Sequence, residues 1–199
     1  NSCSGFTNSS SPKEMLYYGA APAQRFGNYL RNLTLDVGTG NPGADGVRFI
    51  ANNTGAVLDV IIKSSDGQGN KGLNLSYTDE QGPCLMKNIK ISGFKRGIDT
   101  GGAVDSITFE HIILEDQTEY GFANGGQVVS IRDLRFSGTV TAYYSSSGNS
   151  VTTLLDSTLT GSGGASSLPA VNNTAGALFA RNLTTSGYDM AINNAAGHG

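Results

Sequence analysis

The sequence predicts an all-β fold, a right-handed parallel β-helix (solenoid) of about seven coils with three short strands per coil. Three observations predict it: a repeat of about 25 residues, an alternation of apolar and polar residues within each repeat, and a composition that favours strands and turns. The 199 residues suffice for one sizeable core, so one folded unit is expected. The 28 glycines, together with regularly spaced Val, Ile, Leu and Phe, are typical of short strands joined by turns.

The first strand of each coil reads small, apolar, polar, as in the tripeptides 46–48 (GVR) and 72–74 (GLN). Because side chains alternate along a strand, the apolar residue is predicted to lie inside the coil and the polar one outside. The predicted outward residues are Arg48, Asn74, Asp99, Ala123, Asn172 and Asn193. The coil that contains Tyr143 and Tyr144 departs from this pattern, and we expect the sheet to be least regular there.

The rest of each coil reads apolar, any, polar, apolar, any, apolar, most clearly at 86–91 (MKNIKI) and 131–136 (IRDLRF). Asn and Asp tolerate the left-handed backbone region, so the polar position is predicted to bend the chain between two strands. We expect these side chains to face inward and to form a hydrogen-bonded ladder, in which His111 has a structural role. The ladder residues are Asn32, Asp59, Asn88, His111, Asp133, Asp156 and Asn182.

The chain divides into an irregular N-terminal segment, 1–27, and the β-helix, 28–199, which we interpret as a portion of a longer protein. This interpretation depends on the absence of an initiating Met and on a repeat that is already present by Leu30. Cys3 and Cys84 could form one disulfide or remain two free thiols, and the sequence leaves both alternatives open.

Charge and hydropathy argue against two classes of partner. The charged fraction is 15%, the net charge is -3, and no run of basic residues exceeds the pair Lys95 and Arg96, so nucleic acid is not expected to bind. No apolar stretch approaches the roughly 20 residues that span a bilayer, so no membrane partner is expected either.

The strand pairs resemble coils of the pectate-lyase-like superfamily. In particular, 41–49 (NPGADGVRF), 51–57 (ANNTGAV) and 79–83 (DEQGP) are similar to a bacterial group described as glycoside hydrolase family 28-related, and more distantly to the β-helices of exo-β-1,3-glucanases. The resemblance covers roughly residues 28–195. It implies an extracellular or cell-surface, carbohydrate-active domain of the polysaccharide hydrolase or lyase type. The alternative is a non-catalytic carbohydrate-binding or structural module, such as an adhesin, fibre or tailspike segment, with flanking domains or other copies of the β-helix as partners.

In that superfamily the first strand series lines a polysaccharide groove. The resemblance therefore points to Arg48, Asn74, Asn172 and Asn193 as substrate-binding residues. A sheet face that carries ladders of polar side chains also matches the repeating hydroxyl groups of a sugar polymer. The insertion 76–83 is expected to stand beside Asp99 as a wall of this groove.

Catalysis is predicted at Asp99 with Asp79 or Glu80. Glycoside hydrolysis needs two carboxyl groups about 5 to 10 Å apart. Adjacent coils of a parallel sheet lie about 4.8 Å apart, so acids one or two coils apart on one face satisfy this requirement. The alternative is that Asp79 and Glu80 belong to a solvated loop and Asp99 is an ordinary surface residue.

No cofactor and no metal site are predicted. The acidic loop formed by Glu115, Asp116 and Glu119 could bind calcium, although exposed acidic turns are common. Of the polygalacturonase motifs only Gly197-His198-Gly199 is present, without its upstream carboxylates, and we interpret it as a coincidence.

Overall fold

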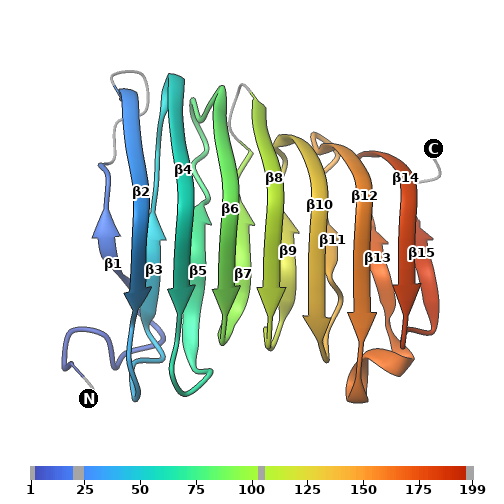
Figure 1. The fold of residues 1–199 in the computed structure, drawn as a ribbon, viewed down its shortest axis with the longest axis horizontal. Coiled ribbons are helices and arrows are strands. Elements are labelled where there is room, and N and C mark those ends of the chain that lie inside the picture. The colour runs from blue at the N-terminus through green and yellow to red at the C-terminus, as the bar shows by residue number, and fades with distance from the viewer. Residues whose placement is uncertain (1–2, 20–24, 103–105, 196–199) are drawn as a thin grey trace.

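The fold is known from a computed structural model that describes residues 3–19, 25–102 and 106–195. The chain runs down the strands at the front of Figure 1 and up those behind while it advances from the N-terminal to the C-terminal end, which makes the solenoid right-handed. All strand pairs are parallel, and about seven coils are stacked. The predicted fold class is therefore confirmed. The segment Gly197-His198-Gly199 lies outside the described residues.

Two parallel sheets form the body of the solenoid, and each coil contributes one strand to each of them. Sheet A holds the short strands β1 (Lys13–Tyr17), β3 (Ala44–Arg48), β5 (Gly69–Leu75), β7 (Phe94–Thr100), β9 (Tyr120–Asn124), β11 (Tyr143–Ser145), β13 (Pro169–Asn173) and β15 (Met190–Asn194). Sheet B holds the long strands β2 (Phe26–Asp36), β4 (Asn52–Lys63), β6 (Cys84–Ser92), β8 (Ser106–Glu115), β10 (Val128–Gly138), β12 (Val151–Gly161) and β14 (Ala177–Ser186). A short 3-10 helix, η2 (Gly163–Ser167), follows β12. No helix in the described ranges is long and apolar enough to cross a membrane.

A left-handed residue at the predicted polar position bends every strand of sheet B. The seven predicted bend residues have φ angles between 51° and 57°, as expected for the left-handed region. Each long strand therefore has two straight segments, which with the sheet A strand gives the three segments per coil that the sequence predicts. Apolar residues before and after the bend, such as Val57 and Val60, both point into the core.

The bend residues face outward, so the predicted inward orientation of this ladder is wrong. Asn32, Asn88 and Asn182 are exposed. The reason is geometric: the left-handed residue interrupts the alternation of side chains, and with apolar residues directed inward on both sides its own side chain is left outside. The ladder consists of separate bonds, such as those from Asn88 Nδ2 to Asp59 Oδ1 (2.8 Å) and from Asn182 Nδ2 to Asp156 Oδ1 (2.9 Å).

An inward polar ladder does exist, at the end of the sheet A strands. Thr100 Oγ1 donates to Asn124 Oδ1 at 2.9 Å, and Asn173 Nδ2 donates to Asn194 Oδ1 at 2.9 Å. Ser145 lies in register between the two pairs and donates to the backbone oxygen of Ala175. These side chains satisfy buried polar groups where the chain turns from sheet A towards sheet B.

The small-apolar-polar pattern of sheet A has a steric cause. A Cβ atom added at Gly46 would lie 2.4 Å from Ile62 Cγ2, so only a small residue fits where sheets A and B approach each other. The coil of Tyr143 and Tyr144, which departs from the pattern in sequence, has the same arrangement in the structure. Tyr143 takes the apolar position, because it is in register with Phe122 and Val171 and is fully buried. The preceding residue, Ala142, takes the small position, although β11 has only three residues.

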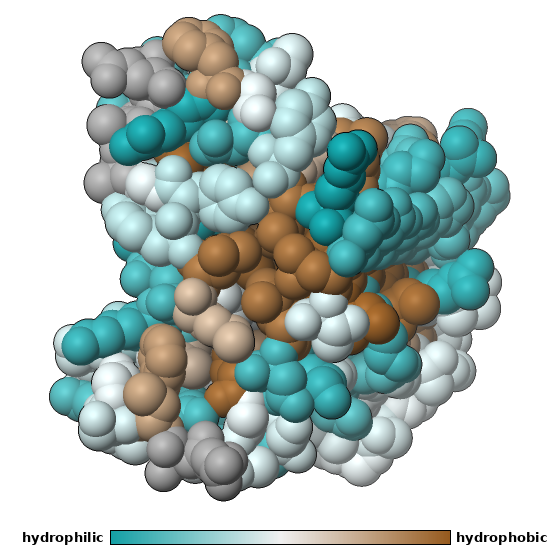
Figure 2. Space-filling model, turned by 60° about the vertical axis from the view of Figure 1, so that its left-hand side comes forward, coloured by the Kyte–Doolittle hydropathy of each residue, from teal (hydrophilic) through white to brown (hydrophobic). Residues whose placement is uncertain are grey.

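The apolar interior reaches solvent at both ends of the described solenoid. Figure 2 shows a hydrophobic area at the centre of the N-terminal end, where Leu16, Leu33 and Leu35 are only partly buried. The large apolar residues exposed on the first and last coils are Met15, Tyr17, Phe26, Tyr29, Phe179, Met190 and Ile192. The solenoid also starts earlier than expected, because β1 lies within the predicted irregular segment 1–27 and pairs with β3.

Cys84 is expected to resist thiol-modifying reagents in the native protein, whereas Cys3 should react readily. The two cysteines are free thiols; Cys3 is exposed and Cys84 is buried. Burial raises the pKa of Cys84 to about 12, so its reactive thiolate is scarce at ordinary pH. Mass spectrometry of a labelling time course measures both rates, and a denatured sample should be labelled at both positions. Rapid labelling of Cys84 in the folded protein would contradict the expectation.

Candidate functional site

The outer face of sheet A carries two axial rows of side chains. Strand register aligns the first row, Tyr17, Arg48, Asn74, Asp99, Ala123, Tyr144, Asn172 and Asn193. The second row, three positions earlier on each strand, is Glu14, Asp45, Lys71, Arg96 and Tyr120. The structure thus brings the predicted substrate-binding residues Arg48, Asn74, Asn172 and Asn193 onto one face with Asp99. Their role in binding stays a prediction.

Asp99 lies at the centre of an ion-pair network. Its side chain is only 7% exposed, and its Oδ1 accepts a hydrogen bond from Arg96 Nη1 at 2.8 Å. Its other oxygen contacts Lys71 Nζ on the preceding strand of sheet A. Arg96 Nη2 also reaches Glu119 Oε1 at 2.6 Å, and these bonds raise the pKa of Arg96. Both oxygens of Asp99 are therefore held by cations.

Asp45, on the same face, has a different environment. It is 3% exposed and accepts hydrogen bonds from Asn70 Nδ2 and Asn74 Nδ2, both at 2.7 Å. Burial raises its pKa, against the lowering effect of these bonds. Asn74 is adjacent in register to Asp99, so an amide lies between the two buried acids.

Aromatic rings lie beside the charged groups of this face. Tyr120 and Tyr144 are stacked, with ring centroids 4.2 Å apart and an interplanar angle of 5°. The guanidinium of Arg96 lies 5.8 Å from the centroid of Tyr120. Arg48 lies 4.8 Å from the centroid of the Tyr77 ring and pairs with Glu14 at 3.1 Å. Each arginine of the two rows thus contacts both a carboxylate and a ring.

A depression opens over Ala123, between Asp99 and Tyr144. Its volume is about 160 Å³, and its wall includes Arg96 and Ser146. The cause is side-chain size, because Ala123 is the smallest residue of a row whose other members are polar or aromatic. The depression therefore combines an apolar floor with polar and aromatic walls.

The other two predicted catalytic residues lie in the loop between β5 and β6. Asp79 is exposed, and the backbone oxygen of Glu80 accepts a hydrogen bond from Asn52 Nδ2 at 3.2 Å. Within the described residues, no hydrogen bond or ion pair joins either acid to Asp99. Joint catalysis by Asp99, Asp79 and Glu80 stays a prediction.

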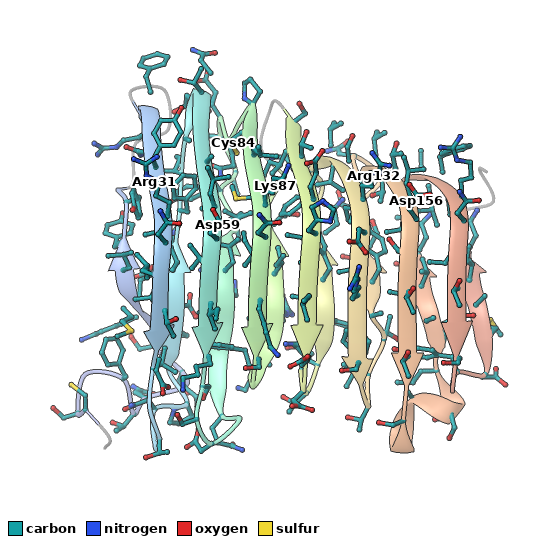
Figure 3. The ribbon with its side chains drawn as sticks, viewed as in Figure 1. Arg31, Asp59, Cys84, Lys87, Arg132 and Asp156 are labelled. Carbon is teal, nitrogen blue, oxygen red and sulfur yellow. The ribbon has the colours of Figure 1, made fainter. Side chains whose placement is uncertain are left out.

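A larger hollow, which the sequence analysis missed, follows the outward ladder of sheet B. Three adjoining parts have volumes of about 430, 640 and 590 Å³, and Asp133 and Arg135 line all of them. Figure 3 shows Asp59, Arg132 and Asp156 on the strands of this sheet. The apolar residues on both sides of each bend were the available signal, because they require an outward bend side chain.

The acids along this hollow are already paired. Asp133 accepts a hydrogen bond from Arg135 Nε at 2.9 Å and lies 2.7 Å from His111 Nδ1. Both contacts lower the pKa of Asp133, and the contact with Arg135 has the larger effect. Asp156 likewise accepts from Arg132 Nε at 3.1 Å.

Two carboxylates of the acidic loop that was considered as a calcium site pair with different basic residues. Glu115 pairs with Lys90 at 2.8 Å, and Glu119 pairs with Arg96. Among the described residues, no three His, Cys, Asp or Glu side chains are grouped as a metal site would require.

The fold and this face define the class of protein: a right-handed parallel β-helix with a polar and aromatic face along its axis. The chain matches no family model, and comparisons with curated proteins and with solved structures also gave no match.

Proposed function

We propose that this chain is an extracellular carbohydrate-binding domain that holds a polysaccharide along the outer face of sheet A. The observation that carries the proposal is the axial row that contains Arg48, Asn74, Asp99 and Tyr144, interrupted by the depression over Ala123. Strands about 4.8 Å apart present hydrogen-bonding groups at regular intervals. A polysaccharide presents hydroxyl groups at regular intervals too, and aromatic rings offer surfaces to its apolar C–H groups.

Replacement of Tyr144 by alanine is expected to weaken polysaccharide binding by about two- to tenfold, since a well-placed aromatic contact contributes roughly 0.5–1.5 kcal/mol. Electrophoresis through gels that contain different polysaccharides measures the affinity as retardation. Phe179→Ala is the control, because Phe179 is an exposed aromatic residue on sheet B. Equal losses in the two variants would contradict the placement of the site.

Hydrolysis or lyase cleavage is a second candidate function, favoured by the unlike environments of two acids on the same face. Burial raises the pKa of Asp45, whereas Asp99 is paired with Lys71 and Arg96. Enzymes often place two carboxyl groups in different environments to divide acid and base roles. Release of new sugar ends from a bound polymer, abolished by Asp99→Asn, is the result that would establish this function.

A further inference from the structure

We infer that the polymer held on this face is an uncharged polysaccharide and that the depression over Ala123 receives one of its sugar units. The inference rests on the proposed function, because it specifies the ligand of the same face. Two independent observations carry it: the pairing of the cations in the two axial rows and the lining of the depression.

The cations of the two rows are already neutralised by carboxylates of the protein. Arg48 pairs with Glu14, Lys71 pairs with Asp99, and Arg96 pairs with both Asp99 and Glu119. An anionic sugar would have to break one of these pairs to gain a cationic partner. Breaking a partly buried pair leaves its carboxylate without a partner, which is costly.

The paired groups of this face also provide no excess of positive charge. Three carboxylates, those of Glu14, Asp99 and Glu119, accompany three cations, those of Arg48, Lys71 and Arg96. A chain of uronic acids would therefore find no net positive charge among these groups to attract it.

The depression itself suits an uncharged sugar ring. Ala123 and Gly125 provide an apolar surface, Tyr144 forms one wall, and Ser146 supplies a hydroxyl group. The two charged residues of the lining, Arg96 and Asp99, are paired with each other. Pockets for small ligands typically combine apolar surface with a few placed polar groups. The side chains that follow along the row, Asn172 and Asn193, are linked by an amide hydrogen bond of 2.9 Å and carry no charge.

The first test fills the depression. Wild-type protein should be retarded in gels that contain at least one neutral polymer, with soluble β-glucan, xylan and galactomannan as probes, and should bind polygalacturonate about tenfold more weakly. Ala123→Gln should lose about tenfold in affinity for the neutral polymer, because its side chain occupies the depression. Ala177→Gln makes the same change at an exposed position of β14 on sheet B, away from this face, and is the matched control that should retain affinity. Thermal unfolding checks that both variants are folded.

The second test reverses the charge preference. Glu119→Gln removes one partner of Arg96 and should raise the affinity for polygalacturonate by up to about tenfold. Glu110→Gln is the control and makes the same change of charge on sheet B. The Glu110 carboxylate lies 3.0 Å from Lys87 Nζ, and its replacement should not alter binding. Wild-type binding of polygalacturonate as tight as that of neutral polymers would overturn the inference and leave the proposed function standing. Binding of no polymer at all would overturn the proposed function itself.

Discussion

Replacement of Asn124 by alanine is expected to lower the free energy of unfolding by about 4 kcal/mol, since loss of a buried hydrogen-bond network is among the most damaging single changes. Asn124 is 1% exposed. Its Oδ1 accepts from Thr100 Oγ1 at 2.9 Å, and from the backbone nitrogens of Gly126 at 3.1 Å and Gln127 at 2.8 Å. Its Nδ2 donates hydrogen bonds to the backbone oxygen of Gln127 at 3.0 Å and to Tyr143 Oη at 3.3 Å.

Alanine would leave several of these groups buried without partners, and each such group costs roughly 1–3 kcal/mol unless water replaces the amide. Urea unfolding monitored by circular dichroism gives the difference in free energy. Asn149→Ala is the control, since Asn149 is exposed in a loop and should change stability by less than about 0.5 kcal/mol. A loss of under about 1 kcal/mol for the Asn124 variant would mean that water satisfies the site.

Replacement of Gly72 by valine is expected to cost about 3 kcal/mol or more, because it forces extra atoms into a packed core. The first added carbon alone would lie 2.2 Å from Ile91 Cγ2 and 2.8 Å from the backbone oxygen of Gly97. The oxygen belongs to the neighbouring strand, so the parallel pairing of β5 with β7 would have to open for the side chain to fit.

Gly148→Val makes the same chemical change where no atom lies within 4 Å of the new carbon. The two thermal midpoints, compared with that of the wild-type protein, separate crowding from the general effect of removing a glycine. A similar midpoint for both variants would show that sheets A and B can move apart at Gly72 without loss of stability.

The elements that the sequence predicts correctly are those with a local signal that recurs in every coil. The polar bend residues, such as Asn88 and Asp133, have the left-handed backbone that their residue type favours. From β3 to β15, glycine or alanine occupies the position where the sheets approach, and the close contacts around Gly46, Gly72, Gly97 and Gly121 show the steric limit. Repetition made both signals readable, because a chance match at one coil is not sustained over seven.

The errors arise where position depends on the coil as a whole. The orientation of the bend side chains was wrong because one left-handed residue interrupts the alternation on which the prediction depended. The coil of Tyr143 and Tyr144 was expected to be the least regular, and β11 is indeed the shortest strand of sheet A, with three residues. The departure from the pattern is nevertheless only chemical, because Tyr143 takes the apolar position and buries its ring while its hydroxyl bonds to Thr152 and Asn124.

The candidate site was predictable in its first row and not in its second. Alternation alone placed Asp99 on the outer face. Its partners Lys71 and Arg96 are respectively on the preceding strand and three residues earlier on its own strand, so they could be identified only from three-dimensional positions. The stacking of Tyr120 on Tyr144 likewise depends on the register between β9 and β11.

Under the proposed function, the one-dimensional stacking of the coils separates the length of the binding face from its specificity. Eight strands of sheet A at about 4.8 Å spacing give a face about 34 Å long. Since the strands of each coil pair only with those of adjacent coils, a coil gained or lost far from Ala123 would change that length by about 4.8 Å and leave the depression unaltered. In the proposed complex, the number of coils would thus set the length of polymer that the face spans, while the small side chain of Ala123 would set which unit fits at one position.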